Sequence, residues 1–271
     1  MKTAQLTTCF VGVALIAAVM SCSTSPTGPV SVPVDMAVRF KPTALTTLID
    51  NAVLRIVYLG TADTTFERPT VARGAIDDTL TLQPGSGVEL YLTARMGEEV
   101  VLYEGYDTVD VIAGGRVTSE IFMQPVASIL RPTPLFQEIS LASEQEAAVG
   151  IDVFNVTNLF GASFRVEYDT ARVSVASVEA GAFLGTDVFF FSYPQQGYVA
   201  ISITRRQPAT DQIGGVSGSG RLATIFFAGK AAGTCPLRFD VERVSLTDPD
   251  GQAVPEMSQM YFETGEIVVS P

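Results

Sequence analysis

The sequence contains no histidine and no tryptophan. Without histidine the chain lacks the commonest general base, the usual partner of a serine or cysteine nucleophile and the commonest transition-metal ligand. A serine–lysine pair would have to use Lys41 or Lys230, the only lysines after residues 1–22, and nothing near either marks a nucleophile. The sequence therefore predicts no catalytic residue, no metal-binding residue and no enzyme activity.

Basic residues are scarce as well. The 17 Lys and Arg residues are outnumbered by 29 Asp and Glu residues, which gives a formal net charge of -12. Such a chain repels phosphate backbones, so we expect no nucleic-acid partner. The 271 residues leave room for two domains of moderate size, and a hydrophobic content of 47% is typical of folded chains rather than disordered ones.

Residues 1–22 have the features of an export signal. Lys2 supplies a positive start, and the apolar run Phe10–Met20 is shorter than the roughly 20 residues that a spanning helix needs. The run leads into Val19-Met20-Ser21-Cys22, which resembles the lipobox of bacterial lipoproteins. This resemblance implies that Cys22 is lipidated and that the protein is exported and membrane-anchored, in the periplasm or at the cell surface. An ordinary secretory signal with an incidental cysteine is the alternative.

The segment after this signal is rich in Ser, Thr, Pro and Gly. It predicts a flexible tether over residues 23–34. Cys9 leaves with the signal and Cys22 is modified, so Cys235 has no partner within the chain. We expect Cys235 to be a small buried residue.

Residues 35–125 show the period-two pattern of short strands. The residues Val88, Leu90, Leu92 and Ala94 alternate with Glu89, Tyr91 and Thr93. Turn residues such as Gly105 separate one run from the next. Six or seven strands at this spacing predict a small antiparallel β-sandwich. Its closing segment resembles the last hairpins of immunoglobulin-like or transthyretin-like surface modules. Residues 126–134, with three prolines from Pro125 to Pro134, predict a linker.

The second half of the chain is organised around the stretch Val149–Val175. Val149, Ile151 and Val153 predict one strand, residues 155–161 a loop, and Phe164, Val166 and Tyr168 a second strand. Further alternating runs follow to the end of the chain. They give eight or nine strands with no convincing helix, so the fold class is all-β and this half is a jelly-roll sandwich.

The residues of this half also resemble the cohesin domain, over residues 135–271. The matching elements are VGIDVFNVTNLFGASFRVEYDTARVSVASVEAG, GYVAISIT, GSGRLATIFFAGKAAGT and LTDPDGQAV before GEIVV, in that order. The resemblance implies a nine-stranded jelly roll that binds a dockerin-type protein module. Any calcium is then expected on the dockerin and no cofactor on this chain. It also implies a role in attaching polysaccharide-degrading enzymes to the cell surface.

The resemblance places the partner-binding face on two strands of this half. Its outward residues are expected to be Ser163, Arg165, Glu167, Ser202, Thr204 and Arg205. Cohesins commonly carry Asn and Asp where this chain has Gly161 and Ser163, and an acidic residue where it has Arg205 and Arg206. The sequence therefore predicts the cohesin fold with a divergent partner. An ordinary solvated sheet face is the alternative interpretation.

A carbohydrate-binding surface module is the alternative function. The missing tryptophan argues against it, because sugar-binding modules often stack pyranose rings on indole side chains. Phe189, Phe191 and Tyr193 nevertheless alternate along one run and could form an aromatic face.

Overall fold

The structure is a computed structural model that describes residues 32–40, 48–58, 64–69, 75–143, 145–206 and 214–271. The predicted signal peptide, Cys22 and most of the predicted tether lie outside the described residues. In the described part the regular structure is almost entirely β, which confirms the predicted class, and the only helical elements there are three short 3-10 turns, η1 (Leu141–Ser143), η2 (Val241–Arg243) and η3 (Pro255–Gln259). None of the helices described is long and apolar enough to span a bilayer.

Seven strands lie in the described residues of the N-terminal part, in agreement with the predicted six or seven. They are β1 (Val32–Phe40), β2 (Asn51–Val57), β3 (Thr64–Pro69), β4 (Ala75–Leu82), β5 (Gly85–Met96), β6 (Val100–Val111) and β7 (Val117–Pro125). Hydrogen bonds join them in the order β3-β2-β5-β6-β7-β1-β4. All neighbours are antiparallel except β1 and β7, which run parallel, so the prediction of a purely antiparallel sandwich is wrong for this pair.

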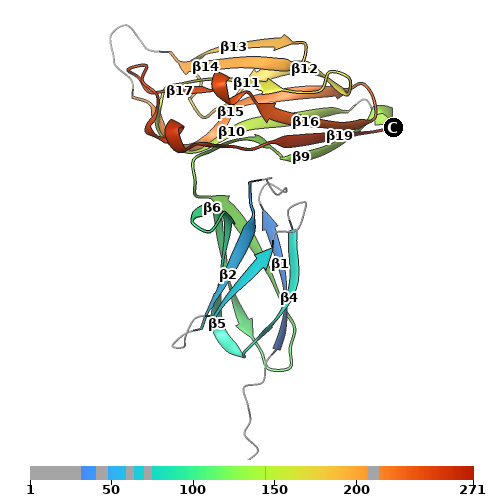
Figure 1. The fold of residues 1–271 in the computed structure, drawn as a ribbon, viewed down its shortest axis with the longest axis vertical. Coiled ribbons are helices and arrows are strands. Elements are labelled where there is room, and N and C mark those ends of the chain that lie inside the picture. The colour runs from blue at the N-terminus through green and yellow to red at the C-terminus, as the bar shows by residue number, and fades with distance from the viewer. Residues whose placement is uncertain (1–31, 41–47, 59–63, 70–74, 144, 207–213) are drawn as a thin grey trace, which may run out of the picture.

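The period-two pattern fixes which face of these strands is buried. Val88, Leu90, Leu92 and Ala94 of β5 all lie in the core, as their alternation predicts. Strand β7 connects the two groups of strands by hydrogen bonds. It pairs with β6 only at Tyr103 and Glu104 of β6, and it pairs with β1 along most of the length of β7. The sheet therefore folds over on itself around a single core instead of forming two separate sheets (Figure 1).

Gly105 does not end a strand, contrary to the prediction. It lies in the middle of β6, where an added Cβ would come within 2.6 Å of the Phe122 carbonyl oxygen and 2.7 Å of Ile121 Cγ2. The missing side chain lets β6 and β7 approach closely. The same residue type that signals a turn elsewhere thus serves here as a packing site.

The C-terminal part is a two-sheet sandwich. Its strands are β8 (Ile129–Thr133), β9 (Phe136–Ser140), β10 (Glu146–Leu159), β11 (Gly161–Glu167), β12 (Val173–Ala180), β13 (Val188–Gln195), β14 (Tyr198–Arg205), β15 (Val216–Gly229), β16 (Gly233–Phe239), β17 (Ser245–Thr247), β18 (Tyr261–Phe262) and β19 (Gly265–Ser270). One sheet has the order β12-β15-β10-β8-β18, and the other β13-β14-β11-β16-β19-β9 with β17 paired to β11. Within residues 135–271, nine of the described strands have five or more residues, which agrees with the predicted jelly-roll number.

The prediction of a loop at residues 155–161 is wrong. Strand β10 continues to Leu159 with register shifts against β15, and it passes through Asn155 and Asn158 at φ of 54° and 55°. Asparagine tolerates this left-handed conformation better than most residues. The Asn155 side chain donates hydrogen bonds to the carbonyls of Pro125 and Ala127, both at 2.9 Å. The two asparagines therefore mark a bulged strand that reaches back to the first part of the chain.

The prediction of a linker at residues 126–134 is also wrong for most of these residues. Residues Ile129–Thr133 form β8, which pairs antiparallel with β10 and parallel with β18. Ile129, Leu130 and Arg131 are buried. Burial of these side chains outweighs the turn preference of the nearby prolines, so the chain enters the second sandwich without a free spacer. Likewise, β1 begins at Val32, inside the predicted tether.

A buried polar network joins the two parts of the chain. Arg131 Nη1 on β8 donates to the Tyr103 hydroxyl on β6 at 2.8 Å, and that hydroxyl donates to a Glu263 carboxylate oxygen. The side chains of Arg131 and Glu263 are 2% and 0% exposed. The Arg131 guanidinium also lies 4.6 Å from the centre of the Phe154 ring. Burial, followed by the nearby Glu263 charge, raises the pKa of Tyr103.

Candidate functional site

The predicted face is the outward side of β13, β14 and β11. In the register of these strands Ser163 lies opposite Ser202, and Ser202 lies opposite Phe191. The intervening residues point into the core, and Phe164, Ile201 and Ile203 are all buried. Period-two alternation therefore places one row of side chains outside and the next row inside.

Five of the six predicted residues lie on this outward side. Ser163, Glu167 and Ser202 are exposed, whereas Arg165 and Thr204 are partly buried. Arg205 is the exception, because it follows the core-facing alternation of Ile201 and Ile203 and pairs with Val188. Its Nη1 donates to the Gly214 carbonyl at 2.5 Å. The structure thus separates Arg205 from the other predicted side chains.

Small residues make the centre of this face a shallow hollow of about 180 Å³. The residues that line it are Gly161, Ala162, Ser163, Ser202, Ile203, Thr204, Ser245 and Thr247. Because most of these side chains are short, another molecule could approach the sheet backbone closely. Ser245 and Thr247 belong to β17 and were not predicted from the sequence.

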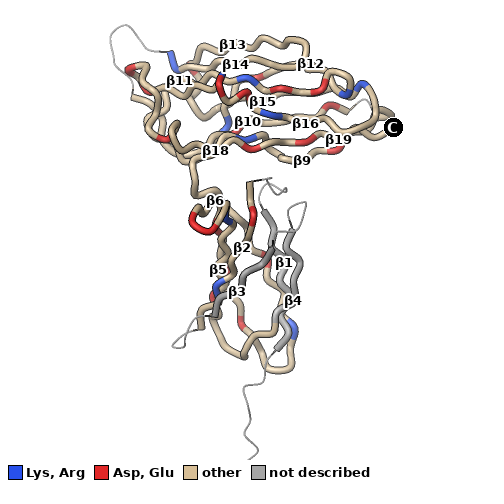
Figure 2. Tube along the Cα trace, in the orientation of Figure 1, with Lys and Arg blue, Asp and Glu red and all other residues tan. Residues whose placement is uncertain are grey.

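An exposed aromatic row borders the hollow. Phe189, Phe191 and Tyr193 are 58%, 62% and 52% exposed on β13, which is the outermost strand of its sheet in the described structure. The rings of Phe191 and Tyr193 stack, with centroids 6.2 Å apart and planes 20° apart. The strand Val188–Gln195 carries no charged residue, as the uniform tan colour of β13 in Figure 2 shows. The three side chains, here called the aromatic row, form an apolar border beside a polar floor.

Two arginines stack on aromatic rings at the ends of this face. The Arg165 guanidinium lies 4.1 Å from the Tyr198 ring centre and 3.3 Å from an Asp240 carboxylate oxygen. The Arg206 guanidinium lies 4.4 Å from the Phe189 ring centre and 3.3 Å from Asp187. These contacts hold both cations against the face instead of leaving them extended in solvent. Arg206 was not predicted to lie on the face, although its position after an alternating strand was a usable signal.

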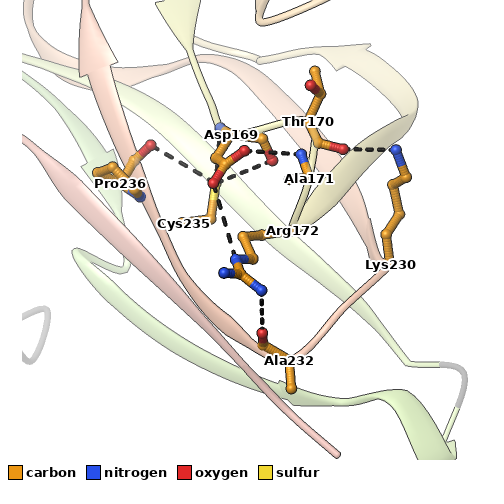
Figure 3. Close-up of polar contacts among 8 residues, drawn as sticks. All are labelled: Asp169, Thr170, Ala171, Arg172, Lys230, Ala232, Cys235 and Pro236. Carbon is orange, nitrogen blue, oxygen red and sulfur yellow. Dashed lines mark hydrogen bonds and ion pairs between the residues drawn. The ribbon is translucent and has the colours of Figure 1, made fainter.

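Asp169, in the turn after β11, has a structural role. Its carboxylate accepts a hydrogen bond from the Ala171 amide at 2.8 Å, and its own amide donates to Cys235 Sγ at 3.3 Å (Figure 3). Lys230 Nζ donates to the neighbouring Thr170 carbonyl at 2.6 Å. This turn links the start of β12 to the end of β15 and to β16. Cys235 is fully buried, as predicted, and burial raises the pKa of its thiol.

No group of three or more potential metal ligands occurs among the residues that the structure describes. The groups that the face itself presents are apolar rings, hydroxyl groups and two ring-stacked arginines.

Comparison with known proteins gives structural matches only. No family model matches the chain, and no curated protein is similar to it. Among solved structures, part of this chain is similar to cohesin domains. A non-cellulosomal cohesin from Archaeoglobus fulgidus is 14% identical with a TM-score of 0.42, and the match covers 54% of this chain and 93% of that chain.

Two bacterial cohesins give matches of the same size. The third ScaC cohesin of Acetivibrio cellulolyticus, solved with a ScaB dockerin, is 19% identical with a TM-score of 0.43, covering 53% of this chain and 99% of that chain. The seventh ScaB type I cohesin of Pseudobacteroides cellulosolvens is 21% identical with a TM-score of 0.42, covering 53% and 92%.

Proposed function

We propose that this chain is a non-catalytic surface lipoprotein whose C-terminal sandwich binds a protein partner through the outward face of β13, β14, β11 and β17. The observation that carries the proposal is the aromatic row, three uncharged rings that are each more than half exposed beside a floor of small residues. Contiguous exposed apolar side chains mark interaction surfaces. Aromatic residues and arginine also dominate the energetic centres of protein interfaces.

The partner that we propose is a dockerin-type module. The ordered cohesin motifs over residues 135–271 support this class of partner, whereas Gly161, Ser163 and Arg206 replace the polar residues common in that family. Recognition here would therefore rest on Phe189, Phe191 and the ring-stacked arginines more than on Asn and Asp contacts. Calcium, where required, would be bound by the partner.

The order of the parts fits a surface display role. A lipidated Cys22 and the tether would precede the N-terminal strands, and the aromatic row lies on the edge of the C-terminal sandwich far from those strands (Figure 1). Capture of a partner there would hold polysaccharide-degrading enzymes at the periplasmic or cell surface.

A pull-down from secreted proteins of the same organism tests this function. The bait is the chain without residues 1–22, used with calcium and with a chelator, and the matched variant is Phe191→Ala. Tyr106→Ala, a change at another exposed aromatic residue in the N-terminal part, is the control. We expect the wild type and Tyr106→Ala to retain a dockerin-bearing protein and Phe191→Ala to lose it. Failure to retain any such protein under either condition would remove the dockerin role.

A carbohydrate-binding role remains the second candidate, because the aromatic row itself favours it. Residues at i and i+2 on a strand lie on one face about 6.5 to 7 Å apart, and three such rings could support consecutive sugar units. A glycan array with wild type, Phe189→Ala and Tyr193→Ala tests it. Glycan binding that both substitutions abolish would support this role, and unchanged or absent binding defeats it.

A further inference from the structure

The N-terminal sheet has a hollow of about 420 Å³ on its outer face. It is lined by Tyr91, Leu92, Thr93, Glu104, Gly105, Tyr106, Phe122 and Gln124 of β5, β6 and β7. The hollow lies on the outer face of these strands beside the paired residues Glu104 and Gln124, where Gly105 contributes no side chain. It belongs to a different part of the chain from the aromatic row.

Three aromatic side chains surround this hollow. Tyr106 is 74% exposed, Phe122 is 42% exposed and Tyr91 is 40% exposed. Tyr91 and Tyr106 lie directly opposite each other on β5 and β6, and their ring centroids are 6.2 Å apart with planes tilted by 32°. The rings therefore offer an apolar surface that is open to solvent.

Polar groups form a row at one side of these rings. Thr93 lies opposite Glu104, and Glu104 lies opposite Gln124, so a hydroxyl, a carboxylate and an amide follow each other across three strands. Together they both donate and accept hydrogen bonds. A predominantly apolar hollow with a few converging polar groups is the usual form of a small-ligand site, and its volume falls within the common range of about 300 to 1,000 Å³.

The charges at the hollow limit the class of ligand. Among the residues that line it there is a carboxylate and no Lys or Arg, and the chain as a whole carries a formal charge of -12. Arg55 lies opposite Tyr91 on β2 but is not a lining residue. The Glu104 carboxylate would therefore repel an anionic group placed beside it. A neutral sugar matches both the aromatic rings and the polar row of the hollow. Its ring has an apolar C–H face, and its edge carries hydroxyls that donate and accept hydrogen bonds.

We propose that this hollow binds neutral saccharide units of a glycan, as a site separate from the protein-binding face. The ring face of a sugar packs on Tyr106 and Phe122 while its hydroxyls bond Glu104 and Gln124. The open mouth lets the rest of a polymer extend from the site. Such a site would bring the anchored protein to a polysaccharide surface while the C-terminal sandwich holds its own partner.

The test uses affinity electrophoresis of the chain without residues 1–22 in gels that contain soluble β-glucan, xylan or glucomannan. Polygalacturonate serves as the anionic comparison. The variants are Tyr106→Ala, the conservative Tyr106→Phe, and Phe191→Ala as the control in the aromatic row. Circular dichroism checks that each variant keeps its β structure, which the high exposure of Tyr106 and Phe191 favours.

We expect at least one neutral glycan to retard the wild type, with at least tenfold weaker binding for Tyr106→Ala and nearly full binding for Tyr106→Phe and Phe191→Ala. The proposal is overturned if no neutral glycan retards the protein, if polygalacturonate binds best, or if Tyr106→Ala binds as well as the wild type. Binding that is lost only in Phe191→Ala also overturns it, because the glycan would then occupy the aromatic row. Failure of this test leaves the protein-binding proposal standing, since that rests on a different surface.

Discussion

Removing the guanidinium of Arg131 should destabilise the protein more than any surface ion-pair change. Arg131→Leu would leave the Glu263 carboxylate buried without its cation and would remove the 2.8 Å hydrogen bond to the Tyr103 hydroxyl. The substitution also removes the cation above the Phe154 ring. The network connects β6, β8 and the segment after β18, so both parts of the chain depend on it.

The expected cost follows from the burial of the pair. Taking one partner from a buried ion pair typically costs about 3 to 5 kcal/mol, because the remaining charge stays desolvated. The total stability of a domain is about 5 to 15 kcal/mol, so the loss would be a large part of it. Tyr103→Phe keeps both charges and removes only the shared hydroxyl, for which we expect about 1 to 3 kcal/mol.

Urea unfolding followed by far-ultraviolet circular dichroism measures these costs, since the chain has no tryptophan to report by fluorescence. Arg165→Leu is the matched control, because it removes an arginine whose ion pair with Asp240 has side chains 31% and 23% exposed. That pair should contribute no more than about 1 kcal/mol. If Arg131→Leu costs no more than Arg165→Leu, the network does not join the two parts as described.

Three further outcomes follow from buried or strained residues. In protein without residues 1–22, Cys235 should react with a thiol reagent at neutral pH only on unfolding, because it is fully buried with a raised pKa; immediate reaction would contradict its placement. Asn155→Ala should lower the free energy of unfolding in urea by about 2 to 4 kcal/mol, because it removes two hydrogen bonds and places alanine at a φ of 54°. Asn155→Gly loses the same hydrogen bonds without the backbone strain, so its cost should be about 1 kcal/mol lower. Equal costs for the two variants would show that the backbone at residue 155 is not strained. The raised pKa of Tyr103 keeps its hydroxyl protonated in the folded state above pH 10, where the unfolded tyrosine ionises, so stability should fall by about 1.4 kcal/mol per pH unit there. Tyr103→Phe should remove that slope, and an unchanged slope would assign it to other groups.

Local alternation was enough to predict most strands and one row of the candidate face. Ser163 and Ser202 were placed outward because each sits between two core residues, and the structure pairs them directly. Arg205 lies on the side of Ile203, because period-two alternation continues to the end of β14, so its predicted place in the outward row is wrong. The aromatic row was visible in the sequence as an alternation, but its exposure required the sheet order, which makes β13 the outermost described strand of its sheet.

The remaining errors arose where tertiary contacts override local preference. Prolines around Ile129–Thr133 indicated a linker, yet burial of Leu130 and the ion pair of Arg131 hold this segment in a sheet. Tyr103 and Glu263 meet across 160 positions of sequence, and nothing local to either residue indicates the other. The hollow of the N-terminal sheet likewise depends on residues of β5, β6 and β7 that only the pairing of these strands brings together.

The central claim is that the face formed by β13, β14 and β11 binds a protein partner. Its most direct test is a calorimetric titration of the chain without residues 1–22 with a purified dockerin module encoded in the same genome, in calcium and in chelator. We predict saturable binding in calcium that Phe191→Ala weakens at least tenfold and Tyr106→Ala leaves unchanged. Binding that is equally strong in Phe191→Ala, or no binding with or without calcium, would contradict the account.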